Sequence, residues 1–111
     1  MNTSPIACTL TADQQRCHAD ELLPRLGTRA VRREWVTGGI RMSFAPTPEN
    51  LDAIAQTVNR ERQCCAFLEF RLDVPAAQGE FSLLILGPDG TREFLVGLGV
   101  EASAGADGGL R

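Results

Sequence analysis

The sequence predicts an α+β domain in which about four antiparallel strands, arranged as two hairpins, carry two main helices on one face. Three observations favour this class. Two segments have apolar residues at helical spacing, and two pairs of segments alternate apolar with polar residues. Turn-forming residues separate the members of each pair. The expected order of elements is α-ββ-α-ββ-α, since one sheet with helices on one face would bury all of these apolar stripes.

The first helix is expected to begin near Thr11, which with Gln14 has the spacing of a capping box. Apolar residues then recur at roughly helical spacing: Ala12, Ala19, Leu22, Leu23 and Leu26. Pro24 has no N–H to donate to the carbonyl four residues earlier. We therefore expect the helix to kink or end near Leu23, and Gly27 suits a helix C-terminus.

The first hairpin is expected to follow this helix. Residues 29–36 form its first strand, although their alternation is poor, and the turn lies at residues 37–39. Ile40, Met42 and Phe44 then alternate with polar residues. This pattern predicts a strand with one buried face.

The second helix is the most clearly marked element. Thr47 is the expected N-cap, and Pro48 fits the first helical position, where a missing N–H is harmless. One apolar face is expected to be buried and consists of Leu51, Ile54, Ala55, Val58 and Cys65. This phase directs Cys65 toward the core and leaves Cys64 on the flank, one turn after Glu61.

A second hairpin and a short helix complete the pattern. The first strand alternates apolar with charged residues, the apolar ones being Leu68, Phe70, Leu72 and Val74. After a turn at residues 75–80, alternate residues from Phe81 to Ile85 continue the buried face. A Gly-Pro loop at residues 87–90 then leads to a final helix over residues 91–98.

Composition and charge narrow the class of protein. A chain of 111 residues suits one domain, which we expect over residues 1–98, with a flexible Gly- and Ala-rich tail over residues 99–111. The formal net charge is −3, which argues against a nucleic-acid partner, because such a partner requires a clustered basic surface. No apolar run approaches the roughly 18 residues of a membrane span, and the first ten residues lack the layout of a secretory signal. We therefore expect a cytoplasmic protein with no membrane partner.

The residues best suited to chemistry are cysteines. A reducing compartment favours thiols over a disulfide frame for Cys8, Cys17, Cys64 and Cys65. Cys64 and Cys65 are adjacent at the predicted helix end, where the backbone can leave helical geometry and both sulfurs could converge. A disulfide between these neighbours would strain the peptide that joins them. Cys8 precedes the first helix and could supply a third thiolate.

Three thiolates without a cage of carboxylates form a soft site, which favours thiophilic metals over magnesium or calcium. The candidate metal ligands are therefore Cys8, Cys64 and Cys65. Their spacing is not that of two C-x-x-C pairs, so a structural tetrahedral zinc site is poorly supported. Glu61 and Arg62 are supporting residues. Glu61 could hydrogen-bond the Cys64 thiol, although a solvated flank position is the simpler expectation. Arg62, together with Arg60, could favour the thiolates electrostatically.

Two other interpretations of the cysteines stay open. Cysteine is among the most buried residue types, so the pair could be core residues of a structural or interaction module. A thiol redox or detoxification enzyme would need a thiol of lowered pKa and a resolving partner. The sequence offers no clear general base for it, because His18, beside Cys17, is the only histidine. We assign no catalytic residue, and the sequence favours a protein that is not an enzyme.

Three segments together resemble a known family. They are Ala7-Cys8-Thr9-Leu10, the strand Gly39–Phe44, and Glu61–Phe70 with the pattern Glu-x-x-Cys-Cys-x-Phe-hydrophobic-x-Phe. Over residues 6–96 the chain resembles a small bacterial double-cysteine domain that occurs alone or fused to MerR-type, mercury-responsive regulators.

The resemblance implies heavy-metal handling. Hg(II) is the first candidate, Cu(I) and Zn(II) are alternatives, and the implied thiolate set is Cys8, Cys64 and Cys65. Nothing before Cys8 could form a helix-turn-helix, so the implied form is the stand-alone accessory or sensor. Besides the metal ion, a regulator or a second copy of the chain would be its partner.

Overall fold

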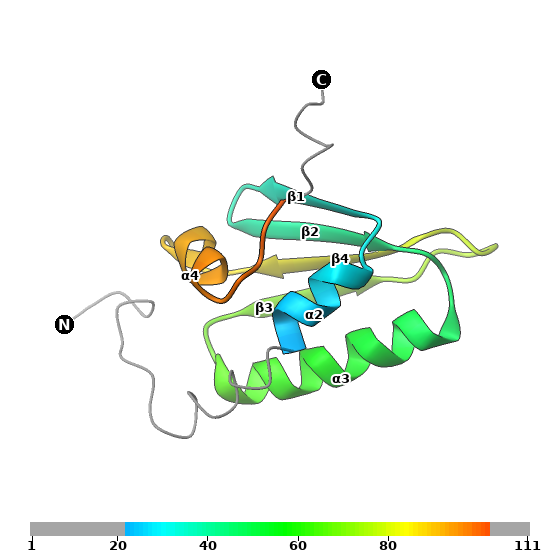
Figure 1. Ribbon diagram of the computed structural model, residues 1–111, viewed down its shortest axis with the longest axis horizontal. Coiled ribbons are helices and arrows are strands. Elements are labelled where there is room, and N and C mark those ends of the chain that lie inside the picture. Colours follow the sequence, from blue (N-terminus) through cyan, green and yellow to red (C-terminus); the bar gives the residue numbers. More distant parts are fainter. Residues whose placement is uncertain (1–21, 103–111) are drawn as a thin grey trace.

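The computed structural model describes residues 22–102, and it has the predicted α+β class and order of elements (Figure 1). A four-stranded antiparallel sheet carries its helices on one face. The elements are α2 (Leu22–Arg29), β1 (Arg32–Val36), β2 (Gly39–Phe44), α3 (Pro48–Cys64), β3 (Glu69–Asp73), β4 (Phe81–Leu86) and α4 (Thr91–Gly97).

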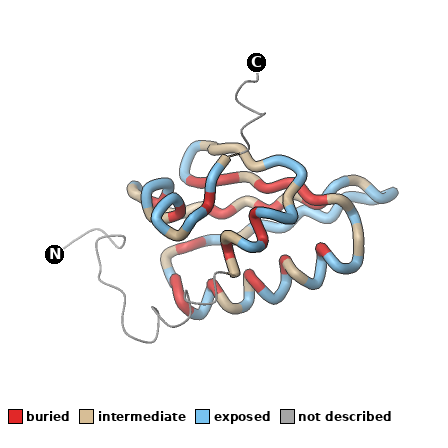
Figure 2. The backbone as a smooth tube through the Cα atoms, viewed as in Figure 1, coloured by how far each residue is buried: buried red, intermediate tan, exposed pale blue. Residues whose placement is uncertain are grey.

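The strand order, which the sequence left open, is β1-β2-β4-β3. The two hairpins therefore join through β2 and β4, and each hairpin contributes one edge strand. Opposite residues of the two central strands face the helices and are fully buried, as in the pairs Ile40–Ile85 and Met42–Leu83. This confirms the predicted buried faces of β2 and β4, and Figure 2 shows burial concentrated along these strands and the inner sides of the helices.

The first hairpin turns more tightly than predicted. Val36 pairs with Gly39, so the turn consists of Thr37 and Gly38 alone, and Gly38 adopts a positive φ of 86°. Gly39 already belongs to β2. A Cβ atom on Gly39 would overlap the carbonyl oxygen of Ile85, so the pairing of β2 with β4 requires glycine there.

The predicted start of the first helix near Thr11, with Gln14, Ala12 and Ala19, lies outside the described residues, so the expected kink or end near Leu23 stays a prediction. Helix α2 continues from Leu22 through Pro24 and Gly27 to Arg29. Pro24 is tolerated because it lies in the first turn of α2, where backbone N–H groups have no intrahelical acceptor. Since α2 includes Arg29, the following strand begins at Arg32 rather than at residue 29.

Helix α3 begins as predicted, with the Thr47 hydroxyl accepting a hydrogen bond from the Asn50 N–H at 3.1 Å and with Pro48 in the first turn. Its buried face, however, is turned by about one residue from the predicted one. The buried residues are Asn50, Ile54, Thr57, Glu61 and Cys64, whereas Leu51 and Ala55 are exposed. Cys64 is thus in the core and not on the flank.

Asn50 can occupy the buried face of α3 because the polar groups of its side chain have partners. The Asn50 side chain donates to the Ala45 carbonyl at 2.9 Å and accepts from Arg29 at 3.0 Å. Hydropathy alone therefore predicted the wrong buried face for α3, because Asn50 counts as polar in the sequence pattern although it is buried with its hydrogen bonds formed.

The final helix lies where it was predicted and is anchored to the sheet. The Arg92 guanidinium carbon lies 4.8 Å from the centre of the Trp35 ring, which is a cation–π contact between α4 and β1. Beyond α4, Val100 is buried and the Glu101 carbonyl accepts a hydrogen bond from Arg33. Within residues 22–102, no helix has the length and apolar character needed to cross a membrane.

Candidate functional site

The adjacent cysteines lie where α3 ends and the chain turns into β3. Cys64 is the last residue of α3, and Cys65 is its C-cap, with φ −127° and ψ 82°. The Cys65 N–H still donates to the Glu61 carbonyl at 2.7 Å, while the Leu68 N–H donates to the Cys65 carbonyl at 3.0 Å. The backbone therefore leaves helical geometry between the two cysteines, as predicted from the sequence.

Both cysteines are enclosed. Cys64 and Cys65 are each 1% exposed and belong to the main core cluster. The short connection that follows them is held against the final helix, because the rings of Phe67 and Phe94 meet edge to face with their centres 5.1 Å apart. The pair lies in a low-dielectric part of the molecule, where an unpaired charge is costly.

Glu61 is the acidic residue of this site. It is 1% exposed, and its Oε1 accepts a hydrogen bond from the Cys65 thiol with a sulfur–oxygen distance of 3.8 Å. Burial raises the pKa of Glu61 to about 7, although the Cys65 hydrogen bond and the charge of Arg60 act in the opposite direction. The expectation of a solvated Glu61 is therefore wrong, because its side chain is buried and its carboxylate accepts a hydrogen bond from the thiol of Cys65, the C-cap residue of α3.

The Cys65 thiol is strongly biased toward its protonated form. Burial raises its pKa to about 12, and the charge of Glu61 and the hydrogen bond to Glu61 act in the same direction. Arg62, expected to favour a thiolate, is exposed in the last turn of α3, where a basic residue interacts well with the helix dipole. The charge that acts on Cys65 is thus the carboxylate of Glu61.

The two cysteines differ in oxidation state. Cys64 is disulfide-bonded, contrary to the expectation of thiols throughout, whereas Cys65 keeps its thiol. The neighbours are therefore not bonded to one another, in agreement with the strain that such a bond would place on their shared peptide.

Other residues of the predicted site lie beyond the described residues. Cys8, Cys17 and His18 fall outside residues 22–102. Inside that range, no group of three or more His, Cys, Asp or Glu side chains is arranged to hold a metal ion. The described part of the site consists of Cys64, Cys65 and the Glu61 carboxylate.

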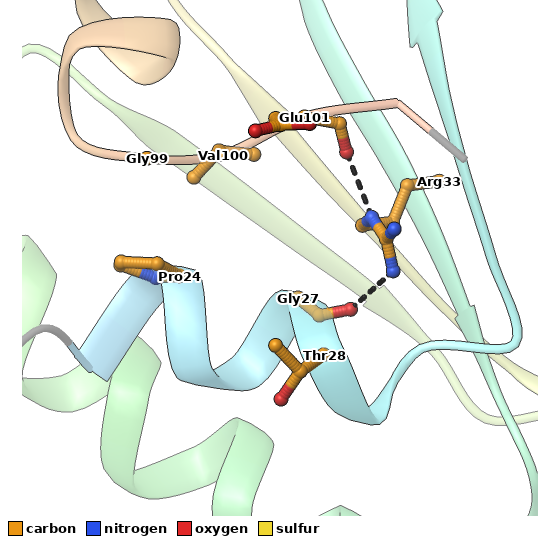
Figure 3. A pocket seen from close by; sticks show the side chains of 7 residues that line it. All are labelled: Pro24, Gly27, Thr28, Arg33, Gly99, Val100 and Glu101. Carbon is orange, nitrogen blue, oxygen red and sulfur yellow. Dashed lines mark hydrogen bonds between the residues drawn. The ribbon is translucent and has the colours of Figure 1, made fainter. Parts of the chain in front are cut away.

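A second polar feature, which the sequence analysis did not predict, involves β1, the edge strand opposite β3. Arg33 spans a hollow of about 170 Å³ between α2 and the segment after α4 (Figure 3). It donates to the carbonyls of Gly27 and Glu101, each at 2.7 Å. Arg33 therefore fastens the C-terminal segment to α2. The only signal for it in the sequence is an arginine at a strand position that faces the core.

Comparisons with known proteins do not assign a family. No family model, no curated protein and no solved structure matches this chain. The resemblance to the double-cysteine domain therefore remains a prediction from the sequence.

Proposed function

We propose that the protein is a cytoplasmic binding domain for a soft metal ion, with Cys64 and Cys65 as its central ligands. The observation that carries this proposal is the burial of two adjacent cysteines at a point where the backbone leaves helical geometry. Cys8 is the proposed third ligand, and Hg(II) is the first candidate ion, with Cu(I) and Zn(II) as alternatives.

The chemistry of the donors supports a thiophilic ion. Thiolate sulfur prefers soft metals, while carboxylate and carbonyl oxygens suit magnesium and calcium. A metal ion binds the thiolate, so it must displace the proton that Cys65 holds strongly in its absence. Replacing this proton is favourable only if the metal–sulfur bond is strong. The site should therefore prefer the most thiophilic of the candidate ions.

The disulfide at Cys64 places a condition on this function. A sulfur in a disulfide offers no thiolate, so binding through Cys64 requires the reduced protein. A reducing compartment maintains that state. We therefore propose binding by the reduced form and little binding by the oxidised form.

A structural or interaction module is the second candidate, and one observation favours it. The burial of both cysteines and the raised pKa of Cys65 are also what a core role would produce. The same raised pKa argues against an enzyme that uses Cys65 as a nucleophile, because such an enzyme needs a lowered thiol pKa.

Metal titration of the reduced protein without oxygen separates the two candidates. Hg(II), Cu(I) and Zn(II) are added in turn, and binding is followed by thiolate-to-metal absorbance and intact mass. Soft-metal binding predicts a one-to-one complex that is weakened in Cys8→Ser, Cys64→Ser and Cys65→Ser. Cys17→Ser is the matched control and should bind like the wild type. Binding that survives Cys64→Ser and Cys65→Ser alike would exclude the proposal.

A further inference from the structure

The two edge strands of the sheet, β1 and β3, differ in how readily each could pair with a strand of another molecule. Arg33, Met42, Leu83 and Leu72 lie opposite one another in one row across the sheet, on the face that carries the helices. At the β1 edge this row ends in Arg33, a charge that points inward, which is a known device against strand addition. At the β3 edge the same row ends in Leu72, which is 41% exposed.

Strand β3 is the edge strand with an exposed large apolar side chain inside the strand, whereas beside β1 the exposed apolar residue, Val31, precedes the strand. Val74, which continues the apolar alternation of Leu72, is 52% exposed, and Figure 2 shows β3 and the segment after it mostly exposed. In the described part of the chain β3 pairs with β4 alone, so its outer backbone N–H and C=O groups have no strand partner there. An apolar, unpaired edge strand is a template for adding another strand.

Helix α3 extends this apolar surface. It runs back along β3 from the turn that joins them (Figure 1), and the stretches from that turn to Leu51 and to Val74 each span about 20 Å. The apolar residues of α3 that the core does not use, Leu51 and Ala55, are exposed. They lie on the flank of α3 opposite the flank that packs on α2, which Ala53 and Gln56 line. The β3 edge and this flank of α3 thus form one surface, here called the β3 edge surface.

The sequence of β3 is complementary to itself when two copies run antiparallel. With Leu72 opposite Leu72, the register places Phe70 opposite Val74 on the helix side and Arg71 opposite Asp73 on the other side, each pair occurring twice. Shifting the strands by two residues, so that Arg71 lies opposite Arg71, would instead place Glu69 opposite Asp73 and juxtapose like charges. Arg71 already binds Glu69 of its own strand at 2.6 Å, while Asp73 forms no ion pair among the described residues.

We propose that the protein forms a symmetric homodimer in which two β3 strands pair antiparallel about Leu72, giving a continuous eight-stranded sheet. The two-fold axis passes between the two Leu72 residues, and the exposed flanks of α3 face one another across it. This isologous arrangement closes on itself and leaves β1, with its inward Arg33, as the outer edge of each copy.

Charge exchange tests this register. Sedimentation velocity of the full chain over a range of concentrations should show a dimer. Arg71→Asp and Asp73→Arg each place like charges opposite one another twice and should weaken the dimer by about tenfold. The double variant restores opposite charges and should return the affinity toward that of the wild type. Leu72→Lys, which points a charge into the pairing face, should give a monomer.

The matched control is Arg32→Asp, which makes the same change of charge on the opposite edge and should leave the dimer intact. Circular dichroism checks that every variant keeps the fold. A wild type that is monomeric at all concentrations overturns the proposal. So does a dimer whose affinity is the same in Arg71→Asp and Asp73→Arg as in the wild type, or a double variant as weak as the single ones.

Discussion

The Cys65 thiol donates a hydrogen bond to the carboxylate of Glu61, one helical turn earlier, and both side chains are almost completely buried. Burial favours the neutral form of the Glu61 carboxyl group. Burial and the neighbouring Glu61 charge favour the protonated form of the Cys65 thiol. The contact therefore links the protonation of the candidate site to the stability of the fold.

Stability should fall as the pH rises through the range in which Glu61 ionises. The pKa of Glu61 is about 7 in the folded protein and 4.5 for an ordinary glutamate, so the folded state binds the proton more tightly. Its contribution to stability is complete below about pH 4.5 and is lost as the pH rises to about 7, at a total cost of about 3 kcal/mol. Urea unfolding of the reduced protein at about pH 5 and about pH 8 measures this difference. Glu61→Gln should flatten the profile, whereas Glu49→Gln, an exposed change on the same helix, should leave it unchanged.

Cys65 should be almost inert toward alkylation in the folded protein. Its raised pKa lowers the thiolate fraction at neutral pH by about a thousandfold relative to an ordinary thiol. Iodoacetamide labelling followed by peptide mass measurement should show little modification until denaturant is added. Glu61→Gln removes a charge that raises the Cys65 pKa, so it should accelerate labelling. Equal rates in folded and unfolded protein would show that Cys65 is accessible and ionised.

Asn50 should be important for stability although it is polar. Its side chain joins the Ala45 carbonyl to Arg29, and its removal leaves these groups without those partners. Asn50→Ala should lower the free energy of unfolding by about 1–3 kcal/mol, measured by urea denaturation. Asn59→Ala, an exposed asparagine on the same helix, should change it by less than about 0.5 kcal/mol.

Two glycines should respond to alanine in opposite ways. At Gly39 the added methyl group would collide with the backbone of Ile85, whereas at Gly97, in α4, nothing lies within 4 Å. Gly39→Ala should destabilise the protein by more than about 2 kcal/mol, since the sheet would have to shift. Gly97→Ala should be neutral or stabilising by up to about 1 kcal/mol. Thermal unfolding of both variants beside the wild type decides the matter, and a stable Gly39→Ala variant would disprove the close approach of β2 and β4.

The elements with local signals could be predicted from the sequence. Thr47 and Pro48 mark the start of α3 by capping chemistry, and the alternation of Ile40, Met42 and Phe44 marks β2, because such signals depend on neighbours in the chain. The strand order depends on contacts between distant segments and had no local signal.

The wrong predictions for α3 and Glu61 concern buried polar residues, which a hydropathy pattern does not identify. Asn50 and Glu61 count as polar in a hydropathy pattern, yet both are buried, Asn50 with the distant Arg29 as a partner and Glu61 beside Cys65, so the predicted buried face of α3 was wrong. The Glu-x-x-Cys-Cys spacing left either cysteine possible as the partner of Glu61, since residues three and four apart are both neighbours on a helix. Cys64 is the last residue of α3 and Cys65 is its C-cap, so the pairing of Glu61 with Cys65 depends on the backbone at the helix end, which the spacing does not specify.

The most direct test of the proposed function is the titration of the reduced protein with Hg(II), compared between the wild type and a Cys64→Ser/Cys65→Ser double variant. Binding is monitored by thiolate-to-metal absorbance. If the metal binds at the end of α3, the wild type should bind one ion tightly, and the double variant should bind none with comparable affinity. An equally tight ion in a folded double variant, or no stoichiometric binding by the wild type, would contradict the proposal and leave the cysteines as core residues.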